Sequence, residues 1–347
     1  MKKVIGISGI NATDNPGPGC GIARSLSEIS PRSSVVGLSY DVNDPGNYLL
    51  GLFDNTFLLP YPNRGWESLK SSLVEIRSKS GLNFLIPSLD VEMPLMIKYQ
   101  DDLAAIGVGT FLPNEEQFNL RSKDVLPSLA KQIGCLCPET KVVHSIDDMV
   151  EFLKKKNDFP VIVKGKYYSA YVVYSIEAAI IRATEIAAIW GFPLLIQEKI
   201  EGQEINVIGL SNNDGQLRAK VSIKKQLTTQ LNKIWTAITI RNEELDKVCD
   251  NFTRETKWRG PFELECMINE NGIYLIEINP RFPSWSYFAT ALGINLPQML
   301  LQIHDSGDCD TRFDYAAGKF FLRYPSEFVT DLTEFQNLIS HQNRNGS

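Results

Sequence analysis

The stretch IYLIEINPRF, Ile273–Phe282, decides how this sequence is interpreted. Apolar residues recur along it as in a β-strand, in which successive side chains point to opposite faces. Glu277, Asn279 and Arg281 occupy alternate positions, so they share one side of the strand if it persists that far. A carboxylate, an amide and a guanidinium on one face at the end of an apolar strand indicate a binding site.

A second strand of similar texture, FELECMI at 262–268, lies just upstream. Asn271-Gly272 follows it and is a dipeptide typical of tight hairpin turns, so Glu265 is expected to lie beside Glu277. Carboxylate and amide oxygens suit Mg²⁺, which usually keeps water and shares its shell with phosphates. Arg281 beside them would meet a phosphate or carboxylate in bidentate fashion. The alternative is a surface strand with paired charges, which is disfavoured because the carboxylates sit among apolar residues, where they would repel one another unless a cation neutralised them.

Length and composition predict an ordinary globular protein of two or three domains. The chain has 347 residues, of which 43% are hydrophobic and 22% charged. A formal net charge of −6 offers no general attraction for nucleic acid or an anionic membrane, so neither is expected as a partner. The most apolar long stretch contains Arg182, Glu185 and Pro193, which argue against a membrane span.

Cysteine and histidine usage narrows the chemistry further. The six cysteines lack framework spacing and no signal peptide is evident, which predicts free thiols in a reducing cytoplasm. Cys135-x-Cys137 has no second pair, so core packing is favoured over zinc binding. With only three histidines, a mechanism based on histidine is not expected.

The first part of the chain alternates strand-like and helix-like segments, which predicts an open, mostly parallel sheet with helices on its faces. The strand-like segments are 2–8, 33–40, 55–60 and 82–89. Ligands sit beyond the carboxyl ends of strands in such sheets. The glycine- and proline-rich loop at 6–26 leads into a helix and is either a small-anion or substrate site or a plain structural loop. Asp90 and Glu92 follow another strand, where they either cap and stabilise a helix start or contact a substrate amine.

The pattern of expected secondary structure changes from about residue 113. The segment at 192–211 is expected to form two strands around a turn at Gly202. An antiparallel sheet is predicted from strand patterns at 217–223, 235–240, 262–268 and 273–278, with one more strand at 318–324. The polar tail at 340–347 is expected to fray.

These motifs together resemble the ATP-grasp superfamily of carboxylate–amine ligases, over about residues 115–300. The arrangement is most similar to its carbamoyl-phosphate-synthetase-like and amino-acid-ligase branch. The resemblance implies that Glu265, Glu277 and Asn279 hold two Mg²⁺ ions, with Mn²⁺ as an alternative, that bridge the phosphates of ATP. It also implies that Arg281 contacts the phosphates or an acyl phosphate.

Upstream residues fit the same resemblance. Lys164 in FPVIVKG is similar to the strand lysine that reaches the phosphates, and with Arg281 it is a candidate catalytic residue. Lys123 in RSKD matches an earlier lysine that contacts the nucleotide. LLIQEKIEGQEINV looks like the hinge that holds adenine and ribose, with four residues in that role: Gln197, Glu198, Ile200 and Glu204. The phosphate-covering loop departs from the family, because KGKYYSAYVV keeps only Gly165 where glycines are usual.

The resemblance implies a mixed α/β chain with three parts. Residues 1–112 would form an open parallel-sheet domain that precedes the ATP-grasp fold. Residues 113–310 would form a two-lobed α+β ATP-grasp domain with its small lobe at about 140–200, and 311–347 a C-terminal strand and tail. Arg259 is a candidate contact for a substrate carboxylate, and Asp90 and Glu92 are further candidates for substrate contacts.

The activity that the resemblance implies is an ATP- and Mg²⁺-dependent ligation. A small-molecule or peptide carboxylate would form an acyl phosphate, and an amine would then displace phosphate. Dimers are common among similar enzymes, and a homodimer is kept as an expectation. One alternative is a catalytically weak ATP-binding or regulatory protein of the same fold, which the altered phosphate loop motivates. A dinucleotide-dependent oxidoreductase, suggested by the loop at 6–26, is a third interpretation.

Overall fold

The structure is a computed structural model that describes residues 3–13, 16–49, 51–165, 169–229, 233–341 and 343–345. The chain divides into two compact units, and each is considered by itself. Unit 1 comprises Met1–Asn119, Ile205–Glu265 and Ile278–Ser347, whereas unit 2 comprises Leu120–Glu204 and Cys266–Glu277. The division into 1–112, 113–310 and 311–347 stays a prediction.

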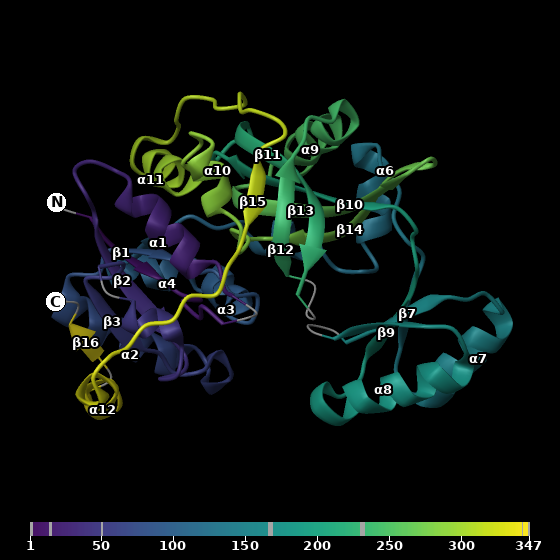
Figure 1. Ribbon diagram of the computed structural model, residues 1–347, viewed down its shortest axis with the longest axis horizontal. Helices are drawn as coiled ribbons and strands as arrows, with labels where there is room; N and C mark the ends of the chain where they lie inside the picture. Colours follow the sequence, from purple (N-terminus) through teal and green to yellow (C-terminus); the bar gives the residue numbers. More distant parts are fainter. Residues whose placement is uncertain are drawn as a thin grey trace. The chain divides into compact units, whose positions relative to one another are not determined.

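The first sheet of unit 1 confirms the predicted parallel arrangement (Figure 1). Its strand order is β16-β3-β2-β1-β4-β5, and every pair is parallel except β16 with β3. The strands are β1 (Val4–Ile7), β2 (Ser34–Ser39), β3 (Asn55–Leu58), β4 (Phe84–Ile86), β5 (Gly109–Thr110) and β16 (Asn343–Asn345). The order reverses between β1 and β4, and such a switch point is where open α/β sheets bind ligands.

Helices cover both faces of this sheet, which explains the unbroken apolar runs in its strands. On β2, Val35 packs in one core cluster with helix α1 (Gly19–Ser27), whereas Val36 packs in another with α2 (Trp66–Ser80). The segment that ends at Asn119 also contains the helices α3 (Met93–Lys98), α4 (Gln100–Ala105) and α5 (Glu115–Asn119) and the short 3-10 helices η1 (Pro45–Tyr48) and η2 (Pro62–Arg64).

Part of the C-terminal tail forms a strand, contrary to the expectation that the tail frays. Asn343–Asn345 form β16, which pairs antiparallel with β3 at the edge of the parallel sheet. From β15 (Phe320–Leu322) the chain continues through an extended segment and helix α12 (Leu332–His341) to β16. Figure 1 shows β16 beside β3. The strand covers the β3 edge, whose unpaired backbone groups would otherwise be exposed.

The second sheet has strand order β14-β13-β10-β11-β12-β15, and its pairs β10–β11, β11–β12 and β12–β15 are antiparallel, as predicted. Its strands are β10 (Gln203–Ser211), β11 (Leu217–Thr228), β12 (Ile234–Thr239), β13 (Gly260–Asn269) and β14 (Gly272–Asn279), together with β15. The helices that follow these strands are α9 (Glu243–Thr256), α10 (Tyr287–Ala291) and α11 (Leu296–Ser306). Asn242 and Asn295 cap α9 and α11 by accepting hydrogen bonds from backbone N–H groups of the first turn.

The β13–β14 hairpin is confirmed, with its turn one residue earlier than predicted. Glu270 and Asn271 separate the two strands, and the backbone N–H of Asn271 donates to the side chain of Asn269. Gly272 is the first residue of β14 and has φ 126°, a conformation that favours glycine. The Asn-Gly dipeptide therefore predicted the correct hairpin, but Gly272 is the first residue of β14 and does not lie in the turn.

Unit 2 contains a four-stranded antiparallel sheet of order β6-β9-β7-β8. Its elements are β6 (Thr140–Val143), α7 (Ile146–Lys156), β7 (Val161–Lys164), β8 (Ala170–Val173), α8 (Ile176–Trp190) and β9 (Leu194–Glu198), preceded by α6 (Leu126–Ile133). Ser145 and Ser175 cap α7 and α8, and the buried faces of both helices share a core cluster with β7 and β9. Figure 1 shows both helices on one side of this sheet.

The segment at 192–211 forms two strands, as predicted, but they do not pair with each other. β9 pairs with β6 and β7, whereas β10 pairs with β11 and joins the other sheet. The residues around Gly202 therefore connect two sheets, and they do not close a hairpin.

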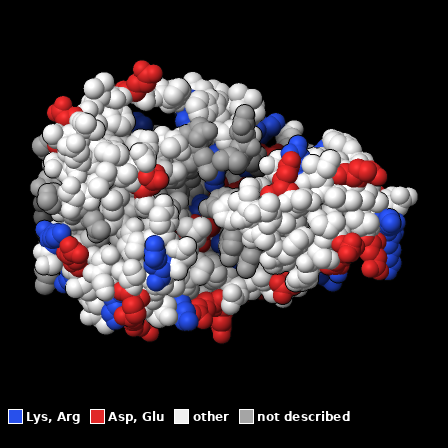
Figure 2. Space-filling model, turned by 90° about the horizontal axis from the view of Figure 1, so that it is seen from below, with Lys and Arg blue, Asp and Glu red and all other residues white. Residues whose placement is uncertain are grey.

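Surface properties give two further observations. No helix in the described ranges is long and apolar enough to cross a bilayer. On the face drawn in Figure 2, the Lys and Arg side chains lie singly or near Asp and Glu side chains, so charges of both signs are mixed there.

Candidate active site

The end of the β13–β14 hairpin gathers three predicted site residues within unit 1. The side-chain nitrogen of Asn279 lies 2.9 Å from a carboxylate oxygen of Glu265. Its carbonyl oxygen lies 3.3 Å from a guanidinium nitrogen of Arg281. Asn279 and Arg281 are buried, with 4% and 6% of their surface exposed. The predicted grouping of Glu265, Asn279 and Arg281 is therefore present in the fold.

Glu277 lies on β14 two residues before Asn279 and is half-buried. It forms no hydrogen bond or ion pair with any residue that the structure describes. Among those same residues, no three His, Cys, Asp or Glu side chains converge as a ready metal cage. An oxygen-rich but incomplete set fits Mg²⁺, which takes part of its coordination shell from phosphate and water.

Lys225 on β11 supplies a positive charge beside Glu265. Its ammonium nitrogen lies 3.1 Å from Glu265, and only 6% of the lysine side chain is exposed. Burial alone would raise the pKa of Glu265, but the charges of Lys225 and Lys233 and hydrogen bonds from Lys225 and Asn279 lower this pKa to about 2. Glu265 is therefore an anion at neutral pH, which is the form in which a carboxylate binds Mg²⁺.

Glu263 is a further buried carboxylate beside these residues. It is 3% exposed and accepts hydrogen bonds from the side chains of Asn206, Asn279 and Trp285. Burial, and next the negative charge of Glu265, raise the pKa of Glu263 above its usual value. Sequence analysis missed this residue, although the alternating pair of glutamates in FELE was a signal for it.

Asp90 follows β4 and forms an ion pair with Arg281, at 2.5 Å between carboxylate and guanidinium. Two candidates 191 residues apart in sequence are thus in contact. Burial would lower the pKa of Arg281, but the charge of Asp90 and its hydrogen bond raise it, with smaller contributions from Glu263 and Glu265. Arg281 therefore stays a cation with its guanidinium held in a fixed direction.

Glu92 lies at the switch point of the parallel sheet and is fully buried. Its carboxylate accepts hydrogen bonds from the Ser8 hydroxyl, the Tyr40 hydroxyl and the backbone N–H groups of Ser88 and Leu89. Burial raises the pKa of Glu92, and these donors oppose the rise. The contacts favour a role in holding the loops after β1 and β4, and a substrate contact by Glu92 stays a prediction.

Substitution of Glu92 separates these two roles. Glu92→Ala is expected to lower the free energy of unfolding by about 2–4 kcal/mol, because buried donors lose their acceptor. Glu92→Gln is expected to cost about 1 kcal/mol or less, because one oxygen still accepts from the loop and the new amide can donate to the Tyr40 hydroxyl. Urea unfolding measures both values. Full stability with lost turnover in Glu92→Gln would instead indicate a substrate contact.

Arg259 precedes β13 and stacks over the ring of Phe111, with 4.4 Å between guanidinium and ring centre. Its only side-chain hydrogen bond among the described residues goes to Gln100, at 3.3 Å. Burial lowers the pKa of Arg259, and no described carboxylate offsets that burial. A substrate carboxylate as its partner stays a prediction.

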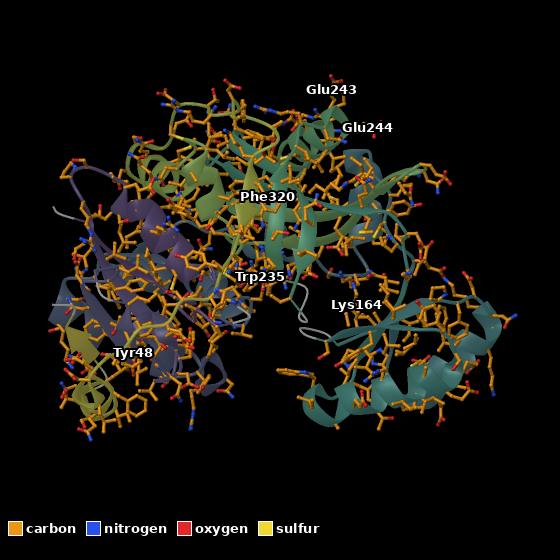
Figure 3. The ribbon with its side chains drawn as sticks, viewed as in Figure 1. Tyr48, Lys164, Trp235, Glu243, Glu244 and Phe320 are labelled. Atoms are coloured by element: carbon orange, nitrogen blue, oxygen red, sulfur yellow. The ribbon has the colours of Figure 1, made fainter. Side chains whose placement is uncertain are left out.

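The predicted nucleotide-contacting residues lie in unit 2. Lys164 ends β7, and its ammonium nitrogen lies 2.6 Å from the side-chain oxygen of Gln197 on β9 (Figure 3). Gln197 is buried and in turn donates to the Thr140 hydroxyl at 2.9 Å. This chain of contacts fixes Lys164 at the strand end. Lys166, Tyr167 and Tyr168 of the predicted phosphate loop lie outside the described residues.

Lys123 lies shortly before α6, and its ammonium nitrogen donates to the backbone oxygen of Ile276 at 3.0 Å.

The remaining hinge residues lie at the end of β9 and the start of β10. Glu198 accepts from the backbone N–H of Glu139, and Ile200 lies beyond β9 with no backbone hydrogen bond to a described residue. Glu204 is half-buried on β10. Ile200 can therefore offer backbone groups to the edge of a nucleotide base.

The chain was compared with known proteins. Residues 192–317 match the family described as ATP-grasp in the biosynthetic pathway with Ter operon. A stretch covering 50% of the chain is 25% identical to the carbamoyl phosphate synthase large chain of Saccharolobus islandicus, and 26% identical to that of Saccharolobus solfataricus. The chain spans only 18% of the length of these curated relatives.

Solved structures share the fold over most of the chain. The biotin carboxylase domain of Hydrogenobacter thermophilus 2-oxoglutarate carboxylase, solved with MgADP, ADP and bicarbonate, aligns with TM-score 0.68 and 15% identity, covering 92% of this chain and 73% of that one. The match to an ATP-grasp family is thus confined to residues 192–317, whereas the likeness of fold extends over most of the chain. L-amino acid ligase from Bacillus licheniformis aligns with TM-score 0.64 and 16% identity, covering 89% of this chain and 75% of that one.

Proposed function

We propose that this protein is an ATP-grasp ligase that joins a carboxylate to an amine at the expense of ATP. The observation that carries the proposal is the cluster of Glu265, Asn279 and Arg281, in which an anionic oxygen, an amide oxygen and a fixed cation lie together. Glu277, two residues before Asn279, would add a second carboxylate. The donor set suits Mg²⁺, and Mn²⁺ would take the same oxygen ligands.

The chemistry requires activation of the acid before the amine can react. A carboxylate oxygen attacks the γ-phosphorus of ATP, the bond to the bridging oxygen breaks, and ADP leaves. The amine then attacks the acyl carbonyl, phosphate leaves with the bonding electrons, and the nitrogen loses a proton to solvent. The protein contributes mainly positioning and charge stabilisation in reactions of this type. Bound Mg²⁺ would neutralise the repulsion between the anionic acid and the triphosphate.

Named residues have separate parts in this proposal. Arg281, held by Asp90, would stabilise charge on the transferred phosphoryl group. Lys164 and Lys123 would contact the nucleotide phosphates, and the residues Gln197, Glu198, Ile200 and Glu204 would hold the base and ribose. Asp90, Glu92 and Arg259 stay candidates for substrate contacts. The partners would be a small-molecule or peptide acid and an amine.

Trapping with hydroxylamine tests the proposal without knowledge of the amine. ADP release is measured with Mg²⁺ and ATP over a panel of amino acids, other carboxylates and peptides, with hydroxylamine as the nucleophile. We expect one acid or class of acids to give a hydroxamate that depends on ATP. ADP release without hydroxamate from any acid would count against an acyl phosphate. ATP binding without cleavage would favour the regulatory alternative.

A further inference from the structure

Glu263 is a buried carboxylate that accepts side-chain hydrogen bonds from three residues, one of which is the candidate metal ligand Asn279. One carboxylate oxygen accepts from the side-chain nitrogen of Asn206 at 2.7 Å and from the indole nitrogen of Trp285 at 2.6 Å. The other oxygen accepts from the side-chain nitrogen of Asn279 at 2.9 Å. All three contacts are made by N–H donors, and the two oxygens of an ionised carboxylate accept them.

Asn279 is the link between this buried carboxylate and the site. An amide nitrogen carries two hydrogens, and on Asn279 one is directed to Glu263 and the other to Glu265. With its nitrogen held by two carboxylates, the amide has one orientation, in which its oxygen faces away from them. That oxygen is the atom that Mg²⁺ accepts as a ligand.

We propose that Glu263 is a positioning residue that fixes the side-chain amide of Asn279 with its oxygen toward the metal. The inference rests on the proposed function, because it gives Asn279 a metal to bind. Hydrogen-bonded partners behind metal ligands orient them, and their loss typically weakens metal binding by about 10–100-fold. Glu263 would have this role without touching the metal.

The contacts predict that glutamine cannot replace Glu263. Trp285 offers a single N–H and no acceptor, so the glutamine oxygen must face Trp285. The new amide nitrogen then faces the nitrogen of Asn279, where two donors meet. Asn279 must either move away or turn its amide, and a turned amide presents nitrogen to the metal.

Trp285 provides a rescue that tests this orientation argument. Trp285→Phe removes the donor that forces the glutamine oxygen to its side. In Glu263→Gln with Trp285→Phe, the glutamine nitrogen can face Asn206 and its oxygen can accept from Asn279. The side-chain oxygen of Asn206 is buried and forms no hydrogen bond with the described residues, so a turned Asn206 amide would accept from that nitrogen.

The experiment measures Mn²⁺ binding in the presence of ADP by electron paramagnetic resonance, which needs no turnover. Full-length wild-type protein, Trp285→Phe, Glu263→Gln and the double variant are compared, and ADP affinity without metal is the control. We expect Mn²⁺ affinity to fall about 10–100-fold in Glu263→Gln. Recovery in the double variant to within a few-fold of Trp285→Phe is the second expected result.

Each other outcome has a definite meaning. The positioning role is overturned if Glu263→Gln binds Mn²⁺ as tightly as the wild type, or if the double variant does not recover affinity. In either case the proposed function still stands, provided that the wild type binds Mn²⁺ with ADP. Failure of the wild type itself to bind Mn²⁺ with ADP overturns the metal site and the inference with it. If Glu263→Gln does not fold, Glu263→Asp decides, because its shorter carboxylate withdraws from Asn279, and the same loss of affinity is expected.

Discussion

A Glu277→Gln variant is expected to lose ATP-dependent turnover by about 10²–10³-fold, the usual cost of removing one preorganised electrostatic contact at the reacting centre. The substitution removes an anionic oxygen ligand and replaces part of it with an N–H₂ group, which repels Mg²⁺. The fold should persist, because Glu277 is half-buried and bonds to no other described residue. Hydroxamate formation or ADP release, with thermal unfolding measured in parallel, checks both parts.

Glu270→Gln is the matched control. Glu270 lies in the turn of the same β13–β14 hairpin and is exposed, so the same chemical change there should leave turnover within about twofold. Near-normal turnover of Glu277→Gln would refute its assignment as a metal ligand. Loss of turnover accompanied by unfolding would show a structural role instead.

The sheets were predictable where burial dictates the pattern of residues. β2 and β4 are apolar on both faces because α1 packs on one side of the sheet and α2 on the other. Such runs typify parallel strands, which helices cover on both sides. The hairpin of β13 and β14 was equally evident from its alternation and its Asn-Gly dipeptide, with the turn shifted by one residue.

Pairing partners were less predictable, because a strand's own sequence does not name its neighbours. Two apolar segments around Gly202 were predicted to form two strands around a turn, yet β9 and β10 belong to different sheets. The polar tail gave no sign of β16, since an edge strand of three residues gains its stability from the backbone of β3 and not from its own side chains.

The site residues also differ in how far local sequence predicts them. Glu265, Glu277, Asn279 and Arg281 were found by their spacing along two adjacent strands. Asp90 was a candidate, but its contact with Arg281 spans 191 residues and depends on how the β4 loop meets the end of β14. The alternating glutamates of FELE place Glu263 on the same face as Glu265, but they do not reveal the three donors that bind it, so Glu263 was missed. Those donors come from three different segments.

Lys164→Ala is expected to weaken the binding of Mg²⁺-ADP by about 1.5–3 kcal/mol, the usual worth of a hydrogen bond to a charged group. This corresponds to a dissociation constant about 10–150-fold higher. The contact with Gln197 fixes the ammonium group at the end of β7, so little ordering is needed when a phosphate binds. Isothermal titration calorimetry measures the change, with Lys141→Ala as control, since Lys141 is exposed on β6 of the same sheet. An unchanged affinity in Lys164→Ala, or an equal loss in Lys141→Ala, would count against a phosphate contact, because a general loss of positive charge is long-ranged and affects both lysines alike.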